Sequence, residues 1–201
     1  EGGVDGILVL GSSGEFTGLT KQEKHDFFKF YADYTAGRTK LYAGTGSLNF
    51  EDTVALSNEV NEMGYEGAMV IGPCYYALDQ EKIFVYYDTL AKSIKGNLYI
   101  YNFPARSGHS IAPETLKKLV ENNTNIKGLK DSVSEPNHTN ELMPLYDMDS
   151  NFSLLFKKLM QHRGVEVLDR AIFPYNQMDE EVYKKAESLM DKVIEEYQNL
   201  K

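Results

Sequence analysis

Lys130 is the residue whose type and position most clearly suggest chemistry. It ends the stretch Ile126 to Lys130, where a short apolar strand pattern gives way to polar residues. Loss of water around an amine favours its neutral form, and a neutral lysine amine attacks ketones to form a Schiff base. Most lysines at strand ends stay solvated and do no chemistry. Lys130 is therefore a candidate nucleophile only if other polar groups gather around it.

Polar groups that suit such a reaction follow other apolar runs. Ser12 and Ser13 lie among glycines, where hydroxyls and backbone N–H groups can bind a carboxylate, although a turn that caps the next helix explains these residues equally well. Tyr101 ends another run, and its phenol could transfer protons. Arg106 carries a guanidinium that can bind a carboxylate with two hydrogen bonds.

A pair of tyrosines, Tyr75 and Tyr76, follows a further apolar run after Gly72. Adjacent tyrosines in a loop are as often packing residues as functional ones. In parallel sheets, however, ligands bind beyond the carboxyl ends of the strands. We therefore expect the side chains that follow the runs to converge at one edge, and this convergence is a stronger indication than any single residue.

Strands and helices that could position these groups alternate along the chain. The runs 3–11 and 64–72 share a spacing of glycines around an acid and an apolar stretch, and further short apolar runs cover 40–44, 97–102 and 126–129. Helical patterns cover 21–36, 50–63, 80–94 and 113–121, and a long amphipathic pattern covers about 179–200. Alternating strands and helices predict an α/β fold with a parallel sheet.

Two parallel architectures are open at this point. An open doubly wound sheet needs only five strands and suits 201 residues, whereas an eight-unit barrel typically needs about 250 residues. The length therefore favours the open sheet. The motifs after the strands, considered below, favour the barrel.

Composition excludes several classes of function. With 30 acidic and 21 basic residues the chain carries a formal charge of −9, which argues against nucleic acid and anionic membrane as partners. No apolar run is long enough for a membrane span, and no signal peptide is visible. The single cysteine, Cys74, fits the reducing cytoplasm, and the four histidines lack metal-ligand spacing. We expect no metal site.

The motifs together resemble one enzyme family. The stretches 11–15, 73–76, 101–108 and 128–130 look like the signatures of the dihydrodipicolinate synthase and N-acetylneuraminate lyase family, in the family's order. The resemblance implies pyruvate-dependent class I aldolases or lyases, usually homotetramers, on a (β/α)8 TIM barrel. It implies a partial barrel domain at 1–155, with five to six βα units, and a C-terminal helical segment of the same domain at 156–201.

Roles for the candidate residues follow from the resemblance. Lys130 would form the imine with pyruvate or a 2-keto acid, and Tyr101 would be the general acid/base. Tyr75 would complete a proton relay across a subunit interface. The substrate carboxylates would be bound by the remaining candidates, namely Ser12, Ser13 and Arg106. The partner substrate would be an aldehyde, and no metal or organic cofactor is required.

The resemblance also implies what this chain lacks. By this resemblance it opens in the family's second strand and lacks the family's seventh and eighth strands, with a glycine-rich segment of the pyruvate pocket, between Leu155 and Phe156. An inactive remnant of the family is therefore an alternative, and a five-stranded flavodoxin-like binding module is another. Within the active alternatives, Arg106 argues against N-acetylneuraminate lyase specificity. A dihydrodipicolinate synthase or a 2-keto-3-deoxy sugar acid aldolase is favoured, with a slight preference for the latter.

Overall fold

The computed structural model describes residues 4–133, 158–159, 161–162 and 179–199. The described residues fall into two compact units. The first unit holds residues 4–11 and 19–133 and contains the sheet. The second holds residues 12–18 and the described residues beyond 134. The predicted boundary at residue 155 lies outside the described residues and stays a prediction.

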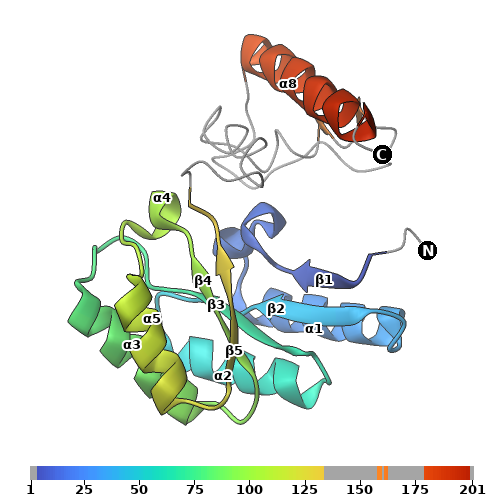
Figure 1. The fold of residues 1–201 in the computed structure, drawn as a ribbon. Coiled ribbons are helices and arrows are strands. Elements are labelled where there is room, and N and C mark those ends of the chain that lie inside the picture. Colours follow the sequence, from blue (N-terminus) through green and yellow to red (C-terminus); the bar gives the residue numbers. More distant parts are fainter. Residues whose placement is uncertain (1–3, 134–157, 160, 163–178, 200–201) are drawn as a thin grey trace. The chain divides into compact units, whose positions relative to one another are not determined.

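The first unit is built on five parallel strands that lie side by side in chain order (Figure 1). Each strand pairs with the next along the chain. A doubly wound sheet reverses its strand order at a switch point, whereas a barrel keeps sequential order. The order therefore decides between the two architectures in favour of an α/β fold of TIM-barrel type, which is incomplete in the described residues. The strands are β1 (Gly6–Val9), β2 (Lys40–Gly44), β3 (Gly67–Ile71), β4 (Leu98–Asn102) and β5 (Ile126–Asp131).

Helices connect consecutive strands. Right-handed crossovers between sequential parallel strands place these helices on one face of the sheet. The predicted helices are confirmed to within two residues at each end, while the short helix α4 after β4 was not predicted. The helices of the first unit are α1 (Lys21–Thr35), α2 (Phe50–Glu62), α3 (Gln80–Ser93), α4 (Pro104–Ser107) and α5 (Pro113–Asn122).

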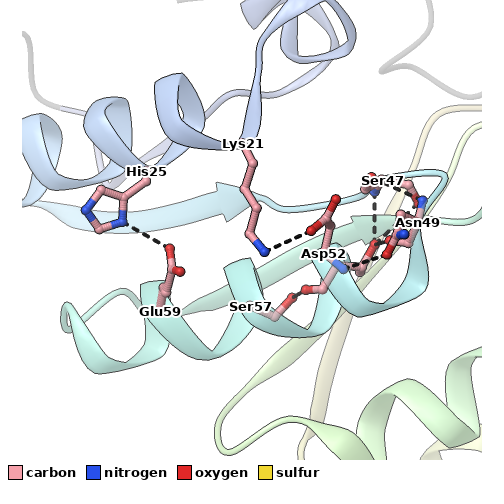
Figure 2. Close-up of polar contacts among 8 residues, drawn as sticks. Lys21, His25, Ser47, Asn49, Asp52, Ser57 and Glu59 are labelled. Carbon is pink, nitrogen blue, oxygen red and sulfur yellow. Dashed lines mark hydrogen bonds and ion pairs between the residues drawn. The ribbon is translucent and has the colours of Figure 1, made fainter.

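The helix starts follow from local capping. Thr20 and Glu23 form a capping box at the start of α1. Asn49 caps α2 by accepting a hydrogen bond from the Asp52 N–H at 3.0 Å. Figure 2 shows Lys21 reaching from α1 to the Asp52 carboxylate of α2, at 2.8 Å. Capping and interhelical pairing together fix α1 beside α2 on the sheet.

The sheet buries one set of alternating side chains against the helices. Ala43, Ala68 and Val70 are completely buried there. The other face carries Tyr42 and Tyr99, whose rings contact edge to face at 5.1 Å. These half-buried rings lie on the face that forms the interior of a closed barrel. The fully buried core side chains include Phe28, Leu56, Ile83, Tyr87, Leu90, Leu98 and Ile100.

The second unit contains the predicted C-terminal helix, observed as α8 (Glu180–Asn199). Its Ala186 is buried with Leu159, and His162 contacts Glu187 and Asp191 of the same helix at 3.2 and 3.0 Å. The unit also holds two 3₁₀ helices, η1 (Ser12–Gly14) and η2 (Phe16–Gly18). The predicted absence of two strands between Leu155 and Phe156 falls outside the described residues.

Candidate active site at the carboxyl ends of β4 and β5

Lys130 and Tyr101 are register partners on neighbouring strands. Register partners on adjacent strands direct their side chains to the same face. The Lys130 Nζ atom lies 3.6 Å from the centroid of the Tyr101 ring, well within cation–π distance. Tyr101 is 6% exposed, and Lys130 is half-buried. The two residues predicted to share the chemistry are thus in direct contact.

Ser132 completes the surroundings of the lysine amine. The Lys130 Nζ donates a hydrogen bond to the Ser132 Oγ at 2.8 Å. Ser132 was not among the predicted site residues, although a residue two positions after a strand lysine tends to lie on the same side of the chain. An aromatic face and a hydroxyl therefore hold the amine in one position at the strand end.

Asn102, the last residue of β4, connects the end of β5 to a second loop. Its side chain is buried, its Nδ2 donates to the Asp131 Oδ1 at 2.9 Å, and its Oδ1 accepts from the Ile111 N–H at 3.1 Å. Its backbone carbonyl accepts from the Ser132 N–H at 2.8 Å. Asn102 belongs to the motif at 101–108 but was not among the predicted site residues. Its position as the last residue of a predicted parallel strand, at the end where ligands bind, is the signal that could have identified Asn102.

Arg106 lies in α4, immediately after β4. The turn is held by Ser107, whose Oγ bonds to the carbonyls of Phe103 and His109 at 3.0 and 2.8 Å. Gly108 ends α4 with a φ of 79°, a conformation that favours glycine. Arg106 is half-buried. The guanidinium is therefore carried on a rigid turn that starts at the same strand end as Tyr101.

Tyr75 occupies a very different environment in the loop after β3. It is 85% exposed, and its ring contacts Tyr76 edge to face at 4.9 Å. Its φ of 87° places a bulky residue in the left-handed region, which costs energy and is frequent at functional sites. A ring so exposed is not part of the contact between Lys130 and Tyr101.

The base of this loop is tightly packed. The Tyr87 hydroxyl donates to the Val70 carbonyl at 3.1 Å, and a Cβ on Gly72 would lie 2.9 Å from the His109 Nε2 atom. Burial raises the pKa of Tyr87 far above its usual value, and burial lowers the pKa of His109. Burial thus disfavours the charged form of both side chains beneath the loop, and a side chain at position 72 would force them to shift.

Ser12 and Ser13 lie in η1, which belongs to the second unit. Ser12 is half-buried and Ser13 is exposed. Just before them, Leu10 turns the chain after β1 with a φ of 55°. The two hydroxyls therefore belong to a different unit from Lys130, Tyr101 and Asn102.

Among the residues that the structure describes, no three or more histidine, cysteine, aspartate or glutamate side chains are placed to hold a metal ion. None of the described helices combines the length and apolar character needed to cross a bilayer.

The family model of the dihydrodipicolinate synthetase family matches residues 1–146 of this chain. The chain belongs to this family. It is 33% identical to YagE of Escherichia coli K12 over 141 residues, which are 70% of this chain and 47% of YagE. It is 34% identical to the 4-hydroxy-tetrahydrodipicolinate synthase of Kosmotoga olearia over 145 residues, 72% of this chain and 49% of that protein. The chain thus spans about half the length of these curated relatives of the family.

Solved structures of family members share the fold. The crystal structure of YagE in complex with pyruvate superposes with a TM-score of 0.82 at 22% identity, covering 94% of this chain and 87% of that one. The 2-keto 3-deoxygluconate aldolase of Picrophilus torridus matches with a TM-score of 0.61 at 32% identity, over 73% of this chain and 52% of that one. The family is one of aldolases and lyases, and the five-stranded sheet described above corresponds to part of its barrel.

Proposed function

We propose that this chain carries the imine-forming half of a pyruvate-dependent class I aldolase or lyase, with Lys130 as the nucleophile. The contact between Lys130 and Tyr101 carries this proposal, because an amine 3.6 Å from a tyrosine ring has a candidate proton donor beside it. The hydrogen bond to Ser132 holds the amine in place before substrate arrives. A match to pyruvate-binding relatives supports pyruvate as the keto acid.

The proposed reaction balances with the groups of this chain, water and one proton from solvent. The neutral Lys130 amine attacks the keto carbon, one proton is taken up from solvent and is returned at the final hydrolysis, water leaves, and a protonated imine forms. In the cleavage direction the bond beyond the neighbouring carbon breaks, and its electron pair moves into the imine to give an enamine and an aldehyde. Tyr101 takes the proton from the leaving hydroxyl and returns one to the enamine carbon. Hydrolysis then releases pyruvate and the free lysine.

Arg106, Ser12 and Ser13 are proposed to bind substrate. A guanidinium on the rigid α4 turn suits a carboxylate or a polar substrate tail. The two hydroxyls suit the carboxylate next to the keto group. Tyr75 is proposed to complete a proton relay in a neighbouring subunit of a homo-oligomer, and its high exposure on one chain supports this arrangement. Such an enzyme would act in the cytoplasm, where the free thiol of Cys74 stays reduced.

Within the family we favour cleavage of 2-keto-3-deoxy sugar acids. The 32% identity to the aldolase of Picrophilus torridus supports this branch. Relatives with the synthase name support the other branch, condensation of pyruvate with an aldehyde that carries a carboxylate. Two assays separate the branches. The aldolase branch predicts release of pyruvate from a panel of 2-keto-3-deoxy sugar acids. The synthase branch predicts consumption of pyruvate in the presence of an aldehyde that carries a carboxylate.

Borohydride trapping tests the chemistry directly. Chain incubated with pyruvate and borohydride gains the mass of pyruvate minus water plus two hydrogens on the peptide that carries Lys130. The variant Lys130→Met gains none. Lys127 is exposed and lies three residues before Lys130 on β5, a spacing that directs the two side chains to opposite faces. Lys127→Met is therefore a matched control that keeps the adduct. Folded wild-type chain without an adduct would contradict the proposal and favour the inactive remnant.

A further inference from the structure

Three hydrogen bonds of Asn102 connect two segments that both matter for the proposed site. One segment is the end of β5, where Asp131 and Ser132 follow Lys130 directly. The other is the loop after α4, where Ile111 lies five positions beyond Arg106. Asn102 is the described residue that bonds to both segments, with Asp131 at 2.9 Å and Ile111 at 3.1 Å.

The bonds leave Asn102 little freedom. Its side chain is 4% exposed, so its amide donor and acceptor depend on protein partners in place of water. Its backbone carbonyl also accepts from the Ser132 N–H at 2.8 Å, which extends the pairing of β4 and β5 by one residue. Ser132 in turn accepts from the Lys130 Nζ at 2.8 Å. Each step from Ile111 to the lysine amine is therefore a hydrogen bond or a neighbouring residue.

We infer that Asn102 is a positioning residue, whose buried amide holds the Lys130 end of β5 and the Arg106 loop at a fixed separation. The inference rests on the proposed function of Lys130. Asn102 does not touch the reacting atoms; it fixes Asp131 and Ser132, and Ser132 fixes the amine. Misplacement of a reacting group by about 1 Å can cost about 100-fold in rate. Loss of this connection is therefore expected to slow imine formation.

The polarity of the bond between Asn102 and Asp131 gives a sharp test. In Asn102→Asp an oxygen replaces the amide donor and faces the Asp131 carboxylate, so two negative charges meet at hydrogen-bond distance. The bond to the Ile111 N–H survives through the second oxygen. In the double variant N102D/D131N the amide of the new asparagine donates to the new carboxylate, so the bond is restored with its direction reversed.

The rate of borohydride-trapped adduct formation with pyruvate is the main readout. N102D lowers this rate about 10-fold or more per folded molecule, and N102D/D131N recovers most of the loss. Asn122 is exposed at the end of α5, so N122D adds the same charge outside the bond between Asn102 and Asp131 and keeps the wild-type rate. A merely structural asparagine would lower the melting temperature in N102D without changing the rate of the folded fraction.

Asp131→Ala serves if N102D does not fold. Asp131 is exposed, so its truncation leaves no cavity and the chain still folds, but it removes the partner of the buried Asn102 amide. Rates are therefore compared per folded molecule. We expect slower trapping in D131A than in D131N, whose amide oxygen still accepts the bond. Equal rates in D131A and wild type would overturn the inference, as would a double variant no faster than N102D.

Amide hydrogen exchange separates this inference from the proposed function. If Asn102 connects the two segments, the Ser132 N–H exchanges faster in N102D and recovers in the double variant, whereas the Ile111 N–H, whose bond survives in N102D, stays protected. This readout needs no chemistry. Wild-type chain that forms no adduct but shows the exchange pattern would refute the proposed function alone, whereas unchanged exchange in N102D would refute the role of Asn102.

Discussion

Tyr101 and Tyr75 lie at the carboxyl ends of neighbouring strands, yet their environments are opposite. Tyr101 is 6% exposed and lies against the Lys130 amine, whereas Tyr75 is 85% exposed and contacts its neighbour Tyr76. The β4–β5 end is held by a hydrogen-bonded series through Asn102. The loop after β3 holds its tyrosine in a costly backbone conformation.

The difference separates two parts of the proposed chemistry. The amine and its nearest phenol are positioned by contacts inside one unit, so imine formation depends on local structure that this chain supplies. Tyr75 gains no burial from its own unit, which is the situation expected of a residue that acts on a partner.

Tyr101→Phe tests the buried side of the contrast. The ring stays in the same position beside Lys130, so the cation–π contact and the fold persist, but the hydroxyl is lost. We expect turnover to fall about 10² to 10⁴-fold, the usual contribution of a general acid/base. Steady-state kinetics with the active substrate measure the effect, and the melting temperature is the control. A loss below about 3-fold would contradict the role of the phenol.

Gly72→Ala tests how strictly the base of the Tyr75 loop is packed. The new Cβ lies 2.9 Å from the His109 Nε2 atom and 3.3 Å from the Tyr87 hydroxyl, so one of the two side chains must shift. Overpacking of this kind costs about 1 to 3 kcal/mol of unfolding free energy. Denaturant unfolding measures it. Gly37→Ala, at a glycine with no neighbour within 4 Å but a φ of 73°, shows the cost of backbone strain alone.

The strand and helix pattern of the first unit was predictable because it depends on local signals. Apolar runs of four to six residues, capping residues and the proline at the start of α5 specify each element nearly independently of the others. The same reasoning placed Lys130 and Tyr101 at one edge. Their direct contact required the register between β4 and β5, which a single strand does not encode.

The choice between an open sheet and a barrel depended on the order in which the strands pair, which the secondary-structure propensity of each segment does not contain. Five strands suit an open sheet or part of a barrel, and only the sequential pairing from β1 to β5 separates them. Asn102 and Ser132 were missed for a related reason. Their importance comes from partners 29 and two residues away, and no composition signal marks a buried asparagine as a connector.

Tyr75→Gly tests whether the exposed tyrosine is held by contacts or only strained. Glycine adopts the φ of 87° without steric cost, which offsets the extra freedom it gives to the unfolded chain. We expect the unfolding free energy to stay within about 1 kcal/mol of wild type. Tyr76→Gly is the matched control, because Tyr76 has no positive φ and gains no relief. If both variants are destabilised equally, contacts of Tyr75 in one chain stabilise the loop and the contrast with Tyr101 weakens.

His109→Gln tests the neutral side chain beneath this loop and should produce the smallest effect. Burial lowers the pKa of His109 in the folded chain below its value near 6.5 when unfolded, so the unfolded chain binds more protons between the two values. The stability that this group contributes is present above the unfolded pKa and is lost as the pH falls toward the folded one. Wild type therefore melts at progressively lower temperature from pH 7.5 to 5.5.

His109→Gln removes the titrating group while keeping a polar atom near Gly72, so its melting temperature changes less over this interval. The carboxylates of Asp79 and Asp88 do not interfere, because their hydrogen bonds to lysines lower their pKa values and their contribution is lost only in stronger acid. A variant that follows the wild-type pH slope would show that water reaches His109. The base of the Tyr75 loop would then be as open as its tip, and only the β4–β5 end would remain packed by the chain itself.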